Sequence, residues 1–256
     1  MKSQHVITSR RAIITGLASG GGLLLAGCAQ TEPPTYGNVL RMADNLTYRM
    51  QRLLLPSHAL VKEYDRRDIT SVPAIGTTDP ADPHQEAYNE KNGLLYQQLR
   101  DGQFGRWRLR IDGSVSRPGS LSLSDLQRFP ARTQITKHTC EEGWSAIAEW
   151  TGVPLRSVLD AAGTRPSARF VSFYAFDATA ESIDMIDALH PQTILAYGMN
   201  GRELPIAHGA PLRLRVERQL GYKSLKFLHH IVVSDRFEDL GKLSEPRNGW
   251  AWYVGI

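Results

Sequence analysis

Hydrophobic and polar residues alternate regularly in the stretch "WRLRID", where an apolar side chain stands at every second position from residue 107 to 112. This period of two predicts a strand with one buried face. Later stretches rich in β-branched and aromatic residues predict further strands. These stretches are "ARFVSFYAF" (168–176), "PLRLRVE" (211–217) and "HHIVVSD" (229–235).

The period changes to that of a helix in three places. Residues 39–55 predict an amphipathic helix, which we expect to pack on the domain rather than lie on a membrane. A second predicted helix has Pro154 in its first turn and ends at Gly163. A short helix follows Ser122, which has Asp125 in capping-box spacing. The apolar positions of the first helix are Val39, Ala43, Leu46, Met50, Leu53 and Leu54.

These elements predict an α+β fold with mixed sheets and short helices, because strands outnumber helices and the helices do not alternate with them regularly. Residues 56–92 are rich in proline, aspartate and threonine and predict a long irregular segment. Long irregular segments within a compact domain often carry function. No internal repeat is visible, so we expect residues 56–256 to form one domain.

The first 27 residues have the pattern of an export signal. Arg10 and Arg11 precede a short glycine-rich apolar stretch, which favours a twin-arginine signal over a spanning helix. The stretch ends in Leu-Ala-Gly-Cys, which resembles a bacterial lipobox with Cys28 as the lipidated residue. A plain secretory signal is the alternative. Residues 28–55 would then form a tether and the amphipathic helix, and the protein would be periplasmic, anchored to the membrane through Cys28.

Composition and charge narrow the class of protein. The chain has 256 residues, of which 41% are hydrophobic and 22% charged, as in a soluble globular protein. The formal net charge is +4. Three positive residues, Lys2, Arg10 and Arg11, lie in the predicted signal, so the rest of the chain is nearly neutral. No basic stripe with interleaved aromatics is present, so we expect no nucleic-acid partner.

Cys140 is the only cysteine beyond the predicted signal and its lipobox. An unpaired thiol in an exported protein needs an explanation. It fits a buried inert side chain, an intermolecular disulfide, a nucleophile or a metal ligand. With His138 as a base, Cys140 would make a thiol enzyme. Support for a zinc site is weak, since the sequence shows no further cluster of ligands beside Cys140 and His138.

Three stretches together resemble the sulfite oxidase family of molybdopterin-dependent oxidoreductases. They span about residues 105–235 in matching order and spacing, and they are most similar to the bacterial periplasmic branch that includes the methionine sulfoxide reductase catalytic subunit. The resemblance implies that family's molybdopterin-binding fold over residues 56–256. The stretches are "ITKHTCEEGWSAIAEWTGVPLRSVLDAAG", "HPQTILAYGMNGRELPIAHGAPLRLRVE" and "GYKSLKFLHHIVVSD".

The resemblance implies a role for each matching residue. Cys140 takes the position of the thiolate that binds molybdenum, and the cofactor's own sulfurs leave room for one such soft ligand. His208 and Arg213 match positions that contact the pyranopterin and its phosphate. The segment Ser224, Leu225 and Lys226 matches the one that closes around that phosphate. From the residues alone, His208 also fits a turn cap, Arg213 and Arg215 fit the polar side of an alternating strand, and Lys226 fits a solvated charge.

The implied activity is transfer of an oxygen atom to or from a small sulfur compound. Reduction of an S-oxide similar to methionine sulfoxide is favoured, with sulfite dehydrogenation as the alternative. A non-catalytic module that keeps the fold without the metal is a third hypothesis. No haem motif is visible, so the resemblance implies a separate electron-transfer protein, with a membrane haem protein as the natural candidate. We expect a monomer.

The chain departs from the family pattern in two places. Ile75, in "VPAIGTTDP", stands where many relatives have an asparagine that helps to hold the cofactor or the substrate. Ala175 replaces a hydroxyl residue of the reductase. Both departures bear on the substrate more than on the cofactor. The aromatic tail "GWAWYVGI" would either close over the cofactor or dock on the core. Trp144 and Trp150 fit the core by residue type, although Trp144 is close enough to Cys140 in sequence to wall the pocket.

Overall fold

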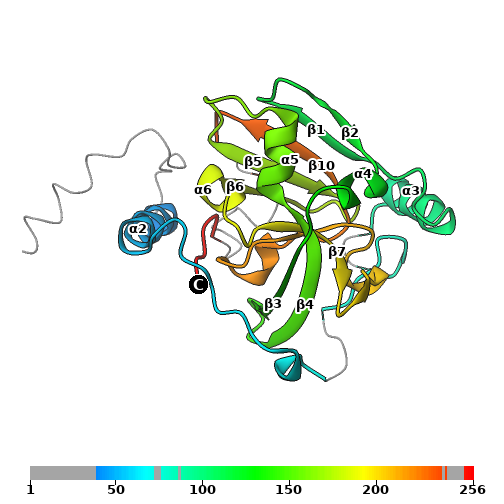
Figure 1. The fold of residues 1–256 in the computed structure, drawn as a ribbon, viewed down its shortest axis with the longest axis horizontal. Coiled ribbons are helices and arrows are strands. Elements are labelled where there is room, and N and C mark those ends of the chain that lie inside the picture. Colours follow the sequence, from blue (N-terminus) through cyan, green and yellow to red (C-terminus); the bar gives the residue numbers. More distant parts are fainter. Residues whose placement is uncertain (1–38, 72–75, 86–87, 238–239, 241–250) are drawn as a thin grey trace, which may run out of the picture. The chain divides into compact units, whose positions relative to one another are not determined.

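Two five-stranded sheets make up most of the fold of this computed structural model, which describes residues 39–71, 76–85, 88–237, 240 and 251–256 (Figure 1). The predicted signal, Cys28 and Ile75 lie outside the described residues. The first sheet has the order β2-β1-β10-β5-β6, and only β1 and β10 run parallel. Its strands are β1 (Leu109–Gly113), β2 (Gly119–Leu121), β5 (Phe170–Ala175), β6 (Ala180–Asp184) and β10 (Leu228–Ser234).

The second sheet is antiparallel throughout. It has the order β3-β4-β7-β8, with β9 paired to the other edge of β7. A long hairpin of β3 and β4 forms its largest part and crosses the lower half of Figure 1. The strands are β3 (Arg132–Thr139), β4 (Ser145–Pro154), β7 (Ile194–Met199), β8 (Arg202–Glu203) and β9 (Arg213–Arg215).

Short helices connect the strands, which confirms the predicted α+β class. The α-helices are α2 (Val39–Leu54), α3 (Glu90–Asp101), α4 (Leu123–Gln127), α5 (Leu155–Ala162) and α6 (Met185–Ala188). The 3-10 turns are η1 (Arg66–Asp68), η2 (Ile206–His208) and η3 (Gly221–Lys223).

The predicted helix boundaries at α4 and α5 are confirmed. The Ser122 hydroxyl accepts from the Asp125 amide at 3.1 Å, and the Asp125 carboxylate accepts from the Ser122 amide at 3.0 Å. Gly163 ends α5 with φ 69°, a left-handed conformation that favours glycine. The main core joins α5 to both sheets through side chains such as Leu159, Phe173 and Leu214. Ala175 belongs to this core and does not line the cavity described below.

Helix α2 packs on the domain as expected, but through its polar face. Tyr48 is buried and donates to Asp184 at 2.8 Å. Arg52 donates to Asp184 at 2.8 Å and to Asp187 at 3.1 Å. From Ala43 onward, the apolar residues of the predicted stripe are exposed, and Leu53 is 63% exposed. Among the described helices, none has both the length and the apolar character to cross a membrane.

The C-terminal residues 251–256 dock on the core, so the described part of the aromatic tail does not close over the cavity. Trp252 and Tyr253 are buried against Tyr48 of α2 and Phe170 of β5. The Trp252 indole N–H donates to the Ser182 hydroxyl at 2.9 Å. This tail therefore joins α2 to the first sheet.

Candidate active site

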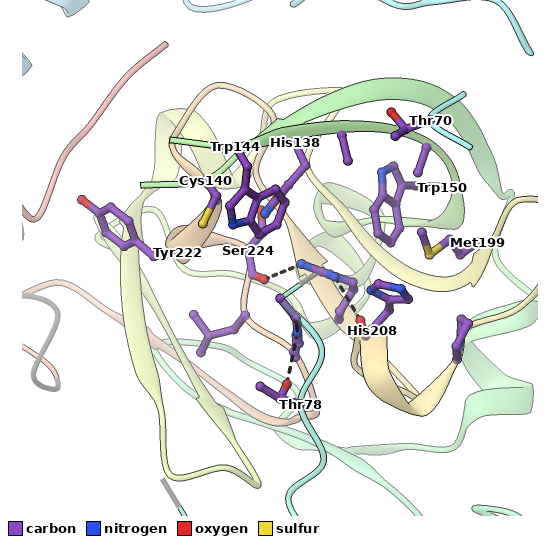
Figure 2. A pocket seen from close by; sticks show the side chains of 18 of the residues that line it. Thr70, Thr78, His138, Cys140, Trp144, Trp150, Met199, His208, Tyr222 and Ser224 are labelled. Atoms are coloured by element: carbon purple, nitrogen blue, oxygen red, sulfur yellow. Dashed lines mark hydrogen bonds between the residues drawn. The ribbon is translucent and has the colours of Figure 1, made fainter. Parts of the chain in front are cut away.

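One cavity of about 760 Å³ opens beside the β3–β4 hairpin (Figure 2). That volume suits a cofactor-sized or drug-sized guest. Its walls come from the hairpin, from β7 and from the segment between residues 205 and 226. The sequence-predicted site residues all line it: Cys140, His208, Arg213, Ser224, Leu225 and Lys226.

Cys140 lies in the tight turn of the hairpin, directly after β3. Its amide donates to the Trp144 carbonyl at 2.9 Å, and its carbonyl accepts from the Gly143 amide at 3.1 Å. Gly143 has φ 91°, which a residue with a side chain rarely adopts, so the glycine allows this turn. The turn points the thiol toward the cavity, beside Trp144, as predicted (Figure 2). The interpretation as an inert core cysteine is therefore wrong.

The Cys140 thiol is surrounded by acids rather than by a base. Its sulfur lies 3.4 Å from a Glu141 carboxylate oxygen and 3.7 Å from one of Glu142. Burial, together with these carboxylates, raises the pKa of Cys140 to about 11. The thiol is thus protonated at neutral pH in this environment, which is unsuited to a free nucleophile. A bound cation would favour the thiolate.

His138 does not serve as a base for Cys140. Its Nδ1 accepts a hydrogen bond from Arg215 at 2.7 Å, so the lone pair that a base needs is occupied. Burial and the charge of Arg215 lower the pKa of His138 to about 2. The thiol-enzyme hypothesis therefore has no support from this geometry.

Two arginines stack on the ring of Trp150 at the back of the cavity. The guanidinium carbons lie 4.9 Å (Arg213) and 4.4 Å (Arg215) from the ring centroid. Glu217 neutralises Arg215 through contacts of 2.9 and 2.7 Å. Arg213 donates only to the backbone carbonyls of His208 at 3.0 Å and Ser224 at 3.1 Å. Both arginines are buried, although the alternation of β9 predicted that they would be solvated.

Arg213 carries a buried charge without a counterion. Its Nε is buried and has no hydrogen-bond partner, and it forms no ion pair within the part of the chain that the structure describes. Burial and the neighbouring Arg215 lower the pKa of Arg213 to about 9. A buried cation of this kind is costly until an anion pairs with it. The cavity wall is therefore prepared for an anionic group.

Lys226 adds a second cation to the same wall. Its ammonium donates to the carbonyl of Gly76, to the Thr78 hydroxyl at 3.1 Å and to the Ala207 carbonyl at 3.2 Å. Burial and Arg213 lower the pKa of Lys226 to about 8. Burial and these two cations also lower the pKa of His208 to about 4. The hydrogen-bond acceptors of Lys226 are all neutral, and the nearby Asp177 carboxyl offsets only part of its charge.

Ser224 and Leu225 shape the wall rather than present charge. The Ser224 hydroxyl accepts from the Val216 amide at 3.1 Å, and the Leu225 carbonyl accepts from the Leu214 amide at 2.8 Å. Both residues are buried. They therefore fix the loop that follows η3 against β9.

Sequence reasoning missed several lining residues. Trp150 was interpreted as core, yet it is the platform under both arginines. Thr78 reaches the cavity from the long irregular segment, whose predicted functional character was the available signal. Asp177 lines the cavity with its pKa raised by burial, and no motif pointed to it.

The described residues thus offer one thiol ligand, a cationic wall in which Arg213 has no ion-pair partner, and space for a large guest. A family model described as "Oxidoreductase molybdopterin binding domain" matches residues 97–240. This chain belongs to that family. It is an oxidoreductase that binds molybdopterin, and the donor set fits the cofactor, because the soft thiol suits molybdenum and the cations suit a phosphate.

Curated relatives of this molybdopterin-binding oxidoreductase have related names. "Putative protein-methionine-sulfoxide reductase subunit YedZ1" of Azospira oryzae is 32% identical over 250 residues, which cover 97% of this chain and 88% of the relative. The protein-methionine-sulfoxide reductase catalytic subunit MsrP of Xanthomonas campestris pv. campestris is 30% identical, over 92% of this chain and 73% of the relative. These matches confirm the predicted branch of the sulfite oxidase family.

A solved structure also resembles the molybdopterin-binding oxidoreductase. The sulfane dehydrogenase SoxCD from Paracoccus pantotrophus aligns with a TM-score of 0.49 and 26% identity, over 51% of this chain and 38% of that one.

Proposed function

We propose that this oxidoreductase reduces S-oxides of the methionine sulfoxide class. The observation that carries the proposal is the distribution of charge in the cavity. Two cations, the buried Arg213 and the partly buried Lys226, line the back wall, while the exposed acids Glu141 and Glu142 stand beside Cys140. A neutral S-oxide tolerates these acids, whereas an anion such as sulfite would be repelled by them.

The back wall would hold the cofactor. In this proposal Cys140 is the ligand to molybdenum, and Arg213, Lys226 and His208 contact the pyranopterin and its phosphate. Ser224 and Leu225 would close the backbone around that phosphate. When bound, the molybdenum cofactor supplies the two-electron chemistry of oxygen-atom transfer.

The mouth of the cavity would bind the substrate. The Trp144 indole N–H donates to the Glu142 carboxylate at 2.6 Å, which holds the indole ring in place at the rim. Trp144 and Tyr222 supply aromatic surface on the side of the cavity where Cys140 lies (Figure 2). A thioether side chain packs favourably against such surface.

The reaction requires electrons and protons from outside the chain. An S-oxide takes up two electrons and two protons and gives a thioether and water. The relatives are named as subunits, which is consistent with a separate electron donor. We propose a separate electron-transfer protein, a membrane haem protein, as that donor and expect the oxidoreductase itself to be monomeric.

The location proposed for the enzyme is the periplasm, with membrane attachment through a lipidated Cys28. The signal pattern of residues 1–27 supports this location. Mass spectrometry of the exported protein would detect the lipid, and a Cys28→Ser variant should release the protein into the soluble periplasmic fraction.

Steady-state assays of molybdenum-loaded protein test the activity. With a reduced viologen dye as electron donor, we expect turnover of methionine sulfoxide. With ferricyanide as acceptor, we expect little oxidation of sulfite. Sulfite oxidation without S-oxide reduction would refute the proposal and favour the sulfite dehydrogenase. Purified protein that folds normally but holds no molybdenum would favour the non-catalytic module.

A further inference from the structure

We propose that the outward face of α2 is a membrane-binding surface that lies on a phospholipid bilayer. Ten large hydrophobic side chains are exposed within the described residues, and five of them belong to this one helix. They recur at spacings of three, four and one, so they form a single stripe along the helix. The five are Met42, Leu46, Met50, Leu53 and Leu54, with exposed fractions of 58, 49, 41, 63 and 68%.

The orientation of α2 is fixed by its other face. Arg52 lies between two buried carboxylates, Asp184 and Asp187, with contacts of 2.8 and 2.9 Å. Asp44 accepts from the backbone amides of Trp252 at 2.9 Å and Tyr253 at 3.3 Å. Turning the helix over would leave both buried carboxylates without Arg52, which is strongly unfavourable. The apolar stripe is therefore held outward.

The chain that leads into α2 points to the bilayer as the occupant. An apolar stretch and Cys28 lie ahead of the helix, with only residues 29–38 between them and Val39. Ten residues span at most about 35 Å, so a membrane attachment at or before Cys28 holds α2 close to the lipid.

The chemistry and size of the stripe agree with this occupant. Its residues are unbranched or γ-branched aliphatic side chains on one convex helix, which fit fluid acyl chains. A helix of 16 residues offers a face of about 24 by 10 Å, well below the roughly 800 Å² per partner of a stable dimer. The stripe continues into Leu55 and Leu60, which are also exposed.

A fluorescence experiment on the full-length holoenzyme tests the proposal. A genetically encoded environment-sensitive fluorescent amino acid replaces Leu46 in one variant and Leu94 of α3 in another. Both leucines are 49% exposed, so they form a matched pair. The proteins are mixed with vesicles of phosphatidylethanolamine and phosphatidylglycerol that carry a doxyl quencher near the headgroup end of the acyl chain. Bound molybdenum and circular dichroism verify that each variant folds.

With vesicles, we expect a blue-shifted emission at position 46 and several-fold stronger quenching there than at position 94. Equal quenching at the two positions overturns the proposal, even if the protein binds the vesicles through its N-terminal residues. A blue shift at position 46 before vesicles are added also overturns it. In that case residues 1–38 or a second copy cover the stripe, and dilution separates these two explanations.

Discussion

At the scale of single residues, the cavity separates two kinds of charge. Arg213 and Lys226 are cations whose buried surroundings lower their pKa values, while Glu141 and Glu142 surround the one thiol. Arg213 forms no ion pair in the described residues and Lys226 donates only to neutral acceptors, so both favour the binding of an anion. Burial and the two glutamates raise the pKa of the thiol, so it stays protonated until a metal cation binds. These opposite requirements can be tested one residue at a time.

Replacing Cys140 by serine should abolish molybdenum binding with little loss of stability. The thiol is partly exposed and contributes no core packing, whereas a serine hydroxyl is a poor ligand for a soft metal site. We expect molybdenum per chain to fall to near zero in elemental analysis and the melting temperature of the apoprotein to stay within about 2 °C. Cys28→Ser is the control and should keep its metal. Full metal content in Cys140→Ser would refute the ligand assignment.

Replacing Lys226 by methionine should reduce retention of the cofactor and leave the apoprotein folded. The methionine keeps the volume of the side chain and removes a partly buried charge whose hydrogen-bond acceptors are all neutral. A charge-assisted contact to phosphate is worth ~1.5–3 kcal/mol, so we expect about a tenfold or greater loss of affinity in pterin release assays. Lys137→Met, at an exposed position of β3, should bind normally. Equal retention in the two variants would contradict the assignment.

At the scale of elements, α2 is held by a small number of buried polar contacts. Arg52→Met should therefore destabilise the protein strongly, because it leaves Asp184 and Asp187 buried without a cation. Removing one partner of a buried ion pair costs ~3–5 kcal/mol, which denaturant unfolding can measure. Arg128→Met breaks only an exposed pair with Asp125, and we expect a loss below ~1 kcal/mol. Similar losses in both variants would show that α2 is not held by this cluster.

The segment that follows α2 is attached through His190. Its Nδ1 accepts from the Gln192 amide at 3.2 Å and its Nε2 lies 3.0 Å from the Ala59 carbonyl, which requires a neutral ring. Burial lowers the pKa of His190 below its ordinary value, so the unfolded chain takes up a proton first as the pH falls. Stability from this histidine is present above about pH 6.5 and is lost on acidification.

His190→Asn should remove that part of the pH dependence. We expect the free energy of unfolding of the wild type to fall more steeply than that of the variant between about pH 7 and pH 5. His84→Asn is the control, since His84 is exposed. Parallel pH profiles for the wild type and His190→Asn would contradict the argument.

Much of the element pattern could be predicted from the sequence, and the failures have physical causes. The strands around Phe173 and Ile231 and the ends of α5 were predictable because local period and capping agree with the tertiary structure. Helix α3 was missed. It buries Gly93 and Tyr96 and exposes Leu94 and Leu95, so its hydrophobic pattern does not mark its inner face.

Two other misassignments involve polar side chains that tertiary contacts bury. Arg213 and Arg215 alternate with leucines and resemble solvated positions, but the Trp150 ring covers both of them in the folded chain. The inner face of α2 was likewise assigned to solvent, because Arg52 meets its carboxylates only in the folded chain. By contrast, the six predicted cavity residues could be identified because the motifs of the family contain them. The period of the hydrophobic residues alone identified none of these six residues.

At the scale of the whole molecule, the C-terminal residues connect α2 to the cavity wall. Asp44 of α2 holds the Trp252 amide, and the Trp252 ring lies 5.7 Å from the ammonium of Lys223 in η3. The neighbouring Tyr222 lines the cavity and donates to the Ala251 carbonyl at 2.6 Å. A helix that rests on lipid would thus be continuous with one side of the cavity.

Asp44→Ala should loosen both ends of this connection. Hydrogen exchange should become faster in α2, in residues 251–253 and in η3, because the Trp252 and Tyr253 amides lose their acceptor. Asp160→Ala, at an exposed position of α5, should leave all three segments unchanged. Faster exchange confined to α2 would show that the segments open independently.

The outward stripe of α2 also has a consequence for selection. Since Leu46, Leu53 and their neighbours are largely exposed and lie opposite the face that docks the helix, folding places little demand on these positions. A mutant library sorted only for soluble expression should drift there toward glutamine, lysine and glutamate. A second library, selected for growth that requires the activity of the membrane-bound enzyme, should retain leucine and methionine at these positions. A difference between the two libraries would show that the stripe serves membrane binding rather than folding.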